Sequence, residues 1–163
     1  MIVALITIPF LLQGLTIMID EFYFHHKRGL PRWERIGHPI DTFFYLLTLI
    51  LIFVTPYSDF SAKVYLLLSI LSTLIIIKDE LIHFEHGIPH EQFLHSLLFI
   101  LHPVSLICAF LIWPVIHQTD KTWIDFFQLT MPQQFILKTA LTFQAVIAGT
   151  FFIYQIVYWN IFK

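Results

Sequence analysis

Hydrophobic residues gather into five long stretches along the chain, separated by short polar segments. The stretches cover residues 2–18, 40–54, 64–77, 93–115 and 135–162. An α-helix needs about 20 predominantly apolar residues to cross a bilayer. The second and third stretches are shorter, so they reach this length only if the polar residues at their ends belong to the same helices. The pattern therefore predicts an all-α protein with about five transmembrane helices.

The amino-acid composition indicates that these helices lie in a membrane. Of the 163 residues, 58% are hydrophobic and only 12% are charged, whereas a soluble domain carries about 25% charged residues. A water-soluble fold cannot bury so much apolar surface, so we expect an integral membrane protein whose partners include membrane lipids. The net charge is −2, and the chain lacks the basic patch of a nucleic-acid-binding protein, so we expect no nucleic-acid partner.

The polar segments divide what we expect to be a single transmembrane domain, residues 1–163. Two similar parts cover about 1–55 and about 62–115, and a last span covers about 135–162. The segment at about 117–134 contains aromatic residues of the kind that lie at a membrane interface.

A pattern of acidic residues, histidines, Gly and Pro occurs twice in the chain. The first copy consists of Asp20-Glu21, His25-His26, Gly29, Pro31, Glu34 and His38. The second copy consists of Asp79-Glu80, His83, His86, Gly87, Pro89, Glu91 and His95. Each copy is typical of a helix end, a turn and a helix start, and two hairpins of the same direction are related by an axis along the membrane normal. We therefore expect a four-helix bundle built from two repeated hairpins, plus a fifth helix.

Basic residues predict how the helices are oriented. One membrane face would hold Lys78 and the basic residues of the first link, which are Lys27, Arg28, Arg32 and Arg35. The other face would hold Lys63, Lys121 and Lys138. Because cytoplasmic loops carry an excess of Lys and Arg, we expect both repeated turns in the cytoplasm, the N-terminus outside and the C-terminus inside. We interpret the basic residues of the first link as such topology signals, or else as contacts to an anionic lipid or phosphate.

Most ionisable residues gather at the two repeated turns. Eight of the nine histidines lie there, namely His25, His26, His38, His83, His86, His90, His95 and His102. Eight of the eleven carboxylates lie there too, namely Asp20, Glu21, Glu34, Asp41, Asp79, Glu80, Glu85 and Glu91. An Asp at the centre of a membrane helix costs about 2.5–3.5 kcal/mol on insertion scales, and less near the interface. A divalent metal ion would satisfy such a cluster, because it supplies the positive charge that carboxylates and neutral imidazoles lack.

Carboxylate–histidine pairs four residues apart support a metal centre. The pairs are Glu21 with His25, Glu34 with His38, Asp79 with His83 (Glu80 is the alternative carboxylate) and Glu91 with His95. Each pair shares one helical face and can present two ligands to one ion. Four helices that each give a carboxylate and an imidazole follow the logic of carboxylate-bridged di-metal bundles, although those bundles use Glu-x-x-His. We therefore predict nine metal ligands: Glu21, His25, Glu34, His38, Asp79, Glu80, His83, Glu91 and His95.

Seven further residues could be ligands or could orient an imidazole: Asp20, His26, Asp41, Glu85, His86, His90 and His102. Simpler interpretations stay open for some of the cluster. Asp20 and Asp79 could terminate helices, and Glu34 could face a helix dipole. His26, His86 and His90 could be solvated, and His102 could be a buried hydrogen-bonding side chain.

The ligand types indicate which metal to expect. Mixed nitrogen and oxygen ligands without sulfur suit iron, manganese or zinc. Because the supply of ligands far exceeds what one zinc ion needs, we expect two divalent metal ions and prefer iron, with zinc or manganese as alternatives.

Parts of this pattern resemble the histidine boxes of the membrane-bound di-iron hydroxylases and desaturases. His86-x3-His90 has the form of one box, and Glu21-x3-His25-His26 has the form of another with Glu in place of its first His. His83-x2-His86 matches half a box. The family's set of three boxes in order is absent, and carboxylates are more numerous here. The resemblance implies oxygen activation on a lipid-like substrate, with electrons from a separate donor.

These observations favour a membrane-embedded di-metal oxidoreductase that acts on a lipid-like or hydrophobic substrate. A zinc-dependent membrane hydrolase is an alternative, because zinc lowers the pKa of a bound water to about 7. A metal-ion transporter or sensor is another, although beyond His102 spans two to four offer only Ser69, Ser72, Thr73 and Ser105 as a polar path. A haem-binding electron carrier would leave the carboxylates unexplained. The chain carries no nucleotide or flavin motif, so any electron donor would be a separate molecule.

Overall fold

The computed structural model describes the backbone of residues 1–86, 89–118 and 121–163. Side chains are described for residues 1–77, 89–118 and 124–163. Every regular element within these ranges is a helix, as the hydrophobic pattern predicts.

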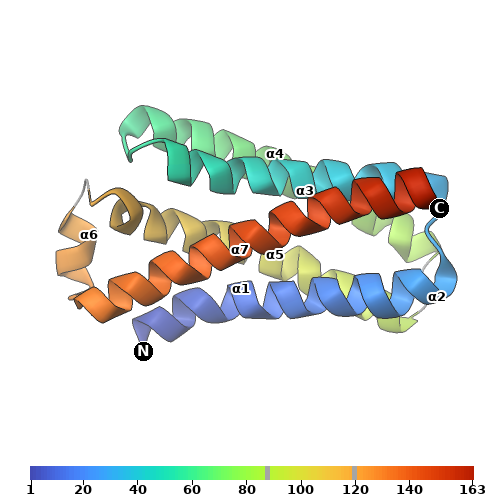
Figure 1. Cartoon of the computed structure of the whole chain (residues 1–163), viewed down its shortest axis with the longest axis horizontal. Coiled ribbons are helices and arrows are strands. Elements are labelled where there is room, and N and C mark those ends of the chain that lie inside the picture. Colours follow the sequence, from blue (N-terminus) through green and yellow to red (C-terminus); the bar gives the residue numbers. More distant parts are fainter. Residues whose placement is uncertain (87–88, 119–120) are drawn as a thin grey trace.

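The described residues form seven α segments, which Figure 1 labels, and two π segments. The first helix consists of α1 (Ile2–Ile19), the π-helix η1 (Asp20–His25) and α2 (His26–Arg28). It is followed by α3 (Arg32–Val54), α4 (Asp59–His86), α5 (Pro89–His117), α6 (Lys121–Phe126), α7 (Met131–Val157) and the π-helix η2 (Tyr158–Phe162).

Five of these helices are long and apolar enough to cross a membrane. Their candidate spans are Ile2–Arg28, Arg32–Val54, Asp59–Ile77, Pro89–His117 and Met131–Phe162. The polar residues at the ends of the second and third stretches do belong to helices, because α3 begins at Arg32 and α4 continues to His86. The link between the first two spans is therefore short, because α2 ends at Arg28 and α3 begins at Arg32.

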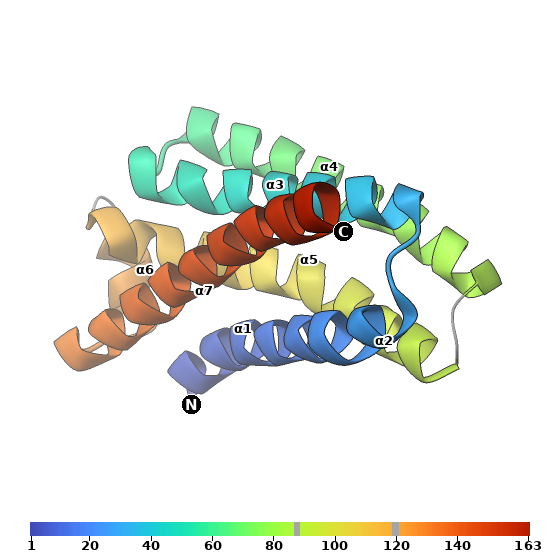
Figure 2. The same cartoon turned by 45° about the vertical axis from the view of Figure 1, so that its right-hand side comes forward.

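Helix α5 lies at the centre of the packing. It contacts α1, α3, α4 and α7, and 56% of its most apolar window is buried, against 17–28% in the other four spans. The buried core lies toward the end of the molecule that holds α6, around Leu49, Ile112, Trp113 and Leu141. Helix α7 packs against both α1 and α3, so the last span lies between these two helices (Figures 1 and 2).

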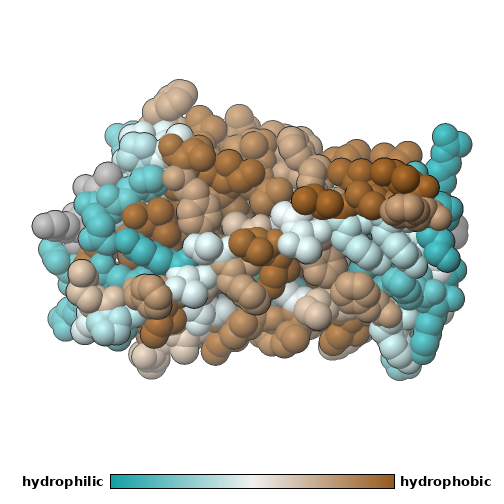
Figure 3. Space-filling view, viewed as in Figure 1, coloured by the Kyte–Doolittle hydropathy of each residue, from teal (hydrophilic) through white to brown (hydrophobic). Residues whose placement is uncertain are grey.

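The molecular surface carries an apolar band. Figure 3 shows hydrophobic residues over the middle of the molecule and hydrophilic residues gathered at its two ends. Large side chains such as Leu15, Leu66, Ile107 and Ile153 are 57–63% exposed within this band. Outward-facing aliphatic side chains on long helices are typical of segments that contact lipid.

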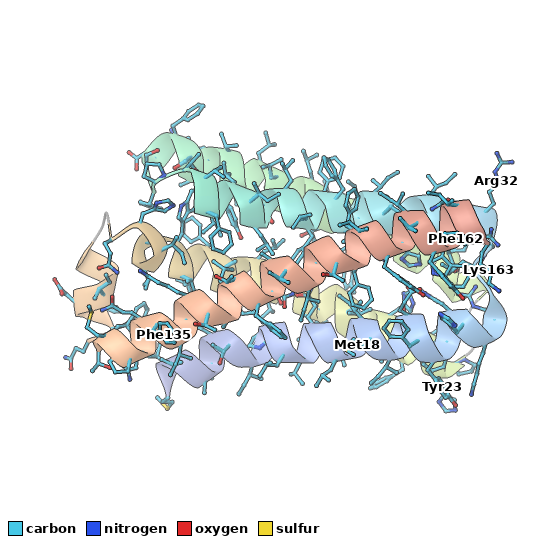
Figure 4. The ribbon with its side chains drawn as sticks, in the orientation of Figure 1. Met18, Tyr23, Arg32, Phe135, Phe162 and Lys163 are labelled. Carbon is cyan, nitrogen blue, oxygen red and sulfur yellow. The ribbon has the colours of Figure 1, made fainter. Side chains whose placement is uncertain are left out.

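The two chain termini lie at opposite ends of the molecule. The N-terminus lies near α6, and the C-terminus lies at the end that holds α2 (Figure 1). Arg32, Lys163 and Tyr23 lie at this second end as well (Figure 4). This end also holds the ionisable side chains that the sequence singles out, which are described next.

Candidate metal centre

A π-helix positions the first group of ionisable side chains. η1 covers Asp20–His25, and its hydrogen bonds connect each residue to the fifth one along the chain instead of the fourth. This wider turn brings Asp20 beside His25, five residues later, while Glu21 contacts the same imidazole from four residues away. An α-helical interpretation of the sequence pairs His25 with Glu21 alone, which is why Asp20 is only a secondary candidate there.

His25 is the centre of the cluster. Its Nδ1 donates to Glu21 Oε2 at 3.2 Å, and its Nε2 lies 3.3 Å from Asp20 Oδ2 and 3.9 Å from Glu91 Oε1. His95 Nε2 lies 3.2 Å from the other oxygen of Asp20. Asp20 therefore lies between one imidazole from η1 and one from α5.

Two overlapping groups have the geometry of a metal site. Asp20, His25, Glu91 and His95 are all buried and form the first group. His25 and Glu34 form the second group with His38. Within each group the potential ligand atoms lie within 4.8 Å of one another. These residues come from η1, α3 and α5, so the two halves of the repeat contribute to one cluster.

Two buried atoms support a fit to a cation. His25 Nε2 and Glu91 Oε2 have no hydrogen-bond partner among the described residues. A buried polar atom without a partner costs about 1–3 kcal/mol, and more when it is charged. A metal ion would satisfy both atoms, because a neutral imidazole nitrogen and a carboxylate oxygen are both metal ligands.

Glu21 contacts the Nδ1 side of the His25 ring, opposite the Nε2 that faces Asp20. Its Oε2 accepts from the imidazole Nδ1, and its Oε1 accepts from the indole Nε1–H of Trp159 in η2. With both oxygens occupied in this way, Glu21 fixes the orientation of the ring and leaves Nε2 to face Asp20 and Glu91. A carboxylate that orients a ligating histidine is a common arrangement around metal ions.

Arg28 bridges two carboxylates of the cluster. Its Nη2 lies 2.8 Å from Glu34 Oε2 and 2.6 Å from Glu91 Oε1. Glu34 was predicted as a ligand and Arg28 as a topology signal. The structure gives Arg28 an internal role, in which it joins the start of α3 to the start of α5.

When the imidazoles are neutral, as metal ligands must be, the charges of the cluster do not balance among its own side chains. Asp20, Glu21, Glu34 and Glu91 are 1–5% exposed, and Arg28 is the cation in direct contact with this group among the described residues. With neutral imidazoles, four carboxylates and one guanidinium leave three negative charges in excess. One or two divalent cations would bring the total to within one charge of neutrality, which lowers the cost of burial.

Three of the predicted secondary residues lie away from this cluster. His26 faces outward. Its Nε2 forms a 3.0 Å hydrogen bond with the Tyr154 hydroxyl, and its ring stacks on Tyr158. His90 is exposed. His102 lies deeper, where its Nε2 is 2.9 Å from Ser72 Oγ, as expected for a buried hydrogen-bonding histidine.

Six predicted residues remain, which are Asp41 and five residues in the second copy of the sequence repeat. Asp41 lines the cavity described below, one helical turn beyond His38. The side chains of Asp79, Glu80, His83, Glu85 and His86 lie outside the described residues. Their roles as ligands stay predictions.

A cavity of about 120 Å³ extends from the cluster into the bundle. Asp20, His25, His38 and His95 line one end of it, and apolar side chains of α5 and α7 line its sides. A water molecule takes about 30 Å³ of liquid volume, so the cavity has room for a few waters or a small part of a ligand.

A hydrogen-bonded group of three polar side chains lines the inner part of this cavity. Tyr45 donates to Gln13 Oε1 at 3.0 Å. Gln144 Nε2 donates to Tyr45 at 3.1 Å and to Gln13 at 3.3 Å. These residues are not among the candidates predicted from the sequence, although a Gln inside an apolar span is itself a signal of an internal polar site. Trp159 gave no comparable signal, because its contact with Glu21 depends on how α7 crosses α1.

No family model, no curated protein and no solved structure matches this chain at the threshold of the comparisons. The geometry of the cluster is therefore the basis on which its function is argued.

Proposed function

We propose that the chain is an integral membrane protein that holds a divalent metal centre at one end of its helices. The observation that carries this proposal is the pair of overlapping groups that share His25, with ligand atoms within 4.8 Å of one another. The excess of buried carboxylates supports it, as do His25 Nε2 and Glu91 Oε2, two buried atoms that accept or donate no hydrogen bond among the described residues.

The proposed centre has two ions. Asp20, His25, Glu91 and His95 would hold the first. Glu34 and His38 would contribute to the second, for which the second copy of the repeat offers Asp79, Glu80 and His83. Because Arg28 contacts Glu34 and Glu91, a second ion at these carboxylates would require its guanidinium to move aside.

We propose that the centre serves a di-metal oxidoreductase, with iron preferred, that acts on a lipid-like or hydrophobic substrate. Two iron ions would supply the chemistry of dioxygen activation. The chain's own residues would do the rest: Glu21 orients His25, and the apolar sides of the cavity exclude bulk water. The cavity lies among helices with exposed apolar surface, so an apolar substrate could approach from the lipid.

The finer arrangement belongs to the same proposal. The two sequence repeats would form two parallel hairpins that bring their turns to one face, with the last span packed against both helices of the first repeat, α1 and α3. The basic residues of the first link favour the cytoplasm for this face, with the N-terminus outside and the C-terminus inside.

The deciding experiment is elemental analysis of protein purified in mild detergent without a chelator. About two irons per chain, the value expected for a di-metal bundle, would support the proposal. Zinc at one or two ions per chain would instead favour a hydrolase, in which zinc activates a water. A substoichiometric mixture that exchanges readily would favour transport, and protein without bound metal would contradict the metal centre altogether.

A further inference from the structure

Aromatic side chains form a continuous array between the exposed surface and the metal-binding cluster. Tyr158 stacks on Tyr154 with ring centroids 5.1 Å apart and an angle of 12°. It also stacks on His26 at 5.1 Å and 16°. On its other side, Tyr158 meets Trp159 edge to face at 4.9 Å. The π-helix η2 places these two consecutive residues at the end of the last span.

The inner end of the array is joined to the cluster by hydrogen bonds. Trp159 is 3% exposed, and its indole Nε1–H donates to Glu21 Oε1. The other oxygen of Glu21 accepts from His25 Nδ1 at 3.2 Å. The path from the indole to the proposed metal ligand His25 therefore contains one carboxylate and two hydrogen bonds.

The outer end of the array reaches the surface. His26 is exposed, and Tyr154 and Tyr158 are partly exposed. The surrounding face is basic, because Lys27, Arg32 and Lys163 are exposed there, as Figure 4 shows for Arg32 and Lys163. The described carboxylates at this end, Asp20, Glu21, Glu34, Asp41 and Glu91, are buried or partly buried. Such a face attracts an acidic partner.

We propose that Trp159 and Tyr158 conduct single electrons to the metal centre from an acidic one-electron donor protein that docks on this basic face. The inference rests on the proposed function, because it requires a redox-active metal with dioxygen as the oxidant. It adds a docking surface and an internal route for the separate electron donor that the sequence implies.

One electron leaves the docked donor and reaches the oxidised metal centre by tunnelling through the Tyr158 and Trp159 rings, which lie between them. Neither ring is left oxidised, so the Nε1 proton of Trp159 stays in its hydrogen bond to Glu21 Oε1. The donor loses one electron and the metal centre gains one, with no proton gained or lost by the protein.

A purely structural role would not require this combination of features. Burying an aromatic ring near a bundle end needs no indole N–H, and a Phe would pack there without a hydrogen-bond partner. The stacked rings of His26, Tyr154 and Tyr158 lie at the surface, where stacking contributes little to the core. A route for electrons requires both the buried contact and the exposed end.

The test measures how fast the oxidised, iron-loaded protein is reduced without oxygen by reduced plant-type ferredoxin, an acidic iron–sulfur protein. The iron absorbance is followed in the wild type, Trp159→Phe and Tyr158→Leu. Phe162→Leu is the matched control, because Phe162 is a 74% exposed aromatic residue at the same end of the molecule (Figure 4). We expect the rate to fall by an order of magnitude in the first two variants and to stay unchanged in the control.

The outcomes separate this inference from the proposed function. Equal rates in all iron-loaded proteins would overturn the route and leave the di-metal oxidoreductase standing. Protein that binds zinc alone would overturn the route and the oxidoreductase, and protein without metal would overturn the metal centre as well. If Trp159→Phe also loses iron, Tyr158→Leu decides, because Tyr158 makes its contact with Trp159 and not with the ligand set. We also expect the wild-type rate to fall as salt is added, since docking is electrostatic.

Discussion

At the scale of single residues, the cluster is organised by what each carboxylate contacts. Glu21 is occupied by His25 and Trp159, whereas Glu91 has one oxygen on Arg28 and one without a hydrogen-bond partner among the described atoms. Asp20 contacts two imidazoles at once. Three acidic side chains that look equivalent in the sequence therefore have different roles in the structure.

Removing one histidine from each half of the cluster tests the ligand set. We expect His38→Ala and His95→Ala each to lower the metal content per chain, because each variant removes a ligand from a different group. Elemental analysis after identical purification measures this. His117→Ala is the control: His117 lies in the last turn of α5, at the end away from the cluster, and hydrogen-bonds to the Ile52 carbonyl. If both cluster variants keep a full complement of metal, the shared site is wrong.

Arg28 allows a second test at this scale. Removing one partner of a buried ion pair costs about 3–5 kcal/mol, and we expect less for Arg28→Ala because the Arg28 side chain remains 28% exposed. The metal-free protein should melt at a lower temperature, and added metal should restore more stability than in the wild type, because a cation replaces the lost charge.

Thermal unfolding in detergent, with and without iron or manganese, measures the Arg28 effect. Arg32→Ala is the matched control, since Arg32 is an exposed basic residue of the same link. A metal-induced shift in melting temperature that is the same in Arg28→Ala and in the wild type would contradict this account.

At the scale of elements, two π-helices flank the candidate site. η1 carries Asp20, Glu21 and His25, and η2 carries Tyr158 and Trp159. A π turn is rare and often marks a functional site, because it changes which side chains share a face. Here it allows two carboxylates to contact one imidazole.

Deleting one exposed residue from η1 tests this dependence on helix geometry. Removing Tyr23, which is 53% exposed, should convert the π turn to an α turn, in which Asp20 lies four residues and Glu21 three residues before the imidazole. Both carboxylates stay on the same face, but each meets the ring at a different angle, so the geometry of the site is lost. We expect unchanged helix content by circular dichroism and a loss of bound metal. Tyr23→Ala keeps the register and should keep the metal. Full metal binding by the deletion variant would show that the π turn is dispensable.

At the scale of the whole molecule, the site lies at one end of a bundle with an apolar belt. The cluster draws on η1, α3 and α5, and α7 reaches it through η2. The distribution of basic residues predicts that this end faces the cytoplasm, and this prediction can be measured directly.

Cysteine labelling in intact cells tests the orientation. The native Cys108 is buried, so a new surface cysteine supplies the signal. We expect a membrane-impermeant thiol reagent to label Phe60→Cys from outside, because Phe60 is 78% exposed at the start of α4. Arg32→Cys, in the first link, should react only after the cells are permeabilised. The reverse pattern would place the cluster outside.

The sequence by itself determined the helices and the composition of the cluster. Hydrophobic stretches of near-membrane length fix five helices, because a chain in lipid must satisfy its backbone hydrogen bonds internally. The cost of placing charged groups in such helices identifies His25, His38, Glu91 and His95 as residues that need a partner. The spacing of the repeat indicates that the two halves meet.

Only the tertiary structure decided how those residues share their contacts. The π turn that brings Asp20 to His25, the ion pair between Arg28 and Glu91, and the bond from Trp159 to Glu21 join residues whose contacts depend on helix geometry or on distant segments. Sequence periodicity assumes a regular α-helix and carries no information about how α7 crosses α1. These contacts depend on packing between helices, and packing is fixed only when the whole chain has folded.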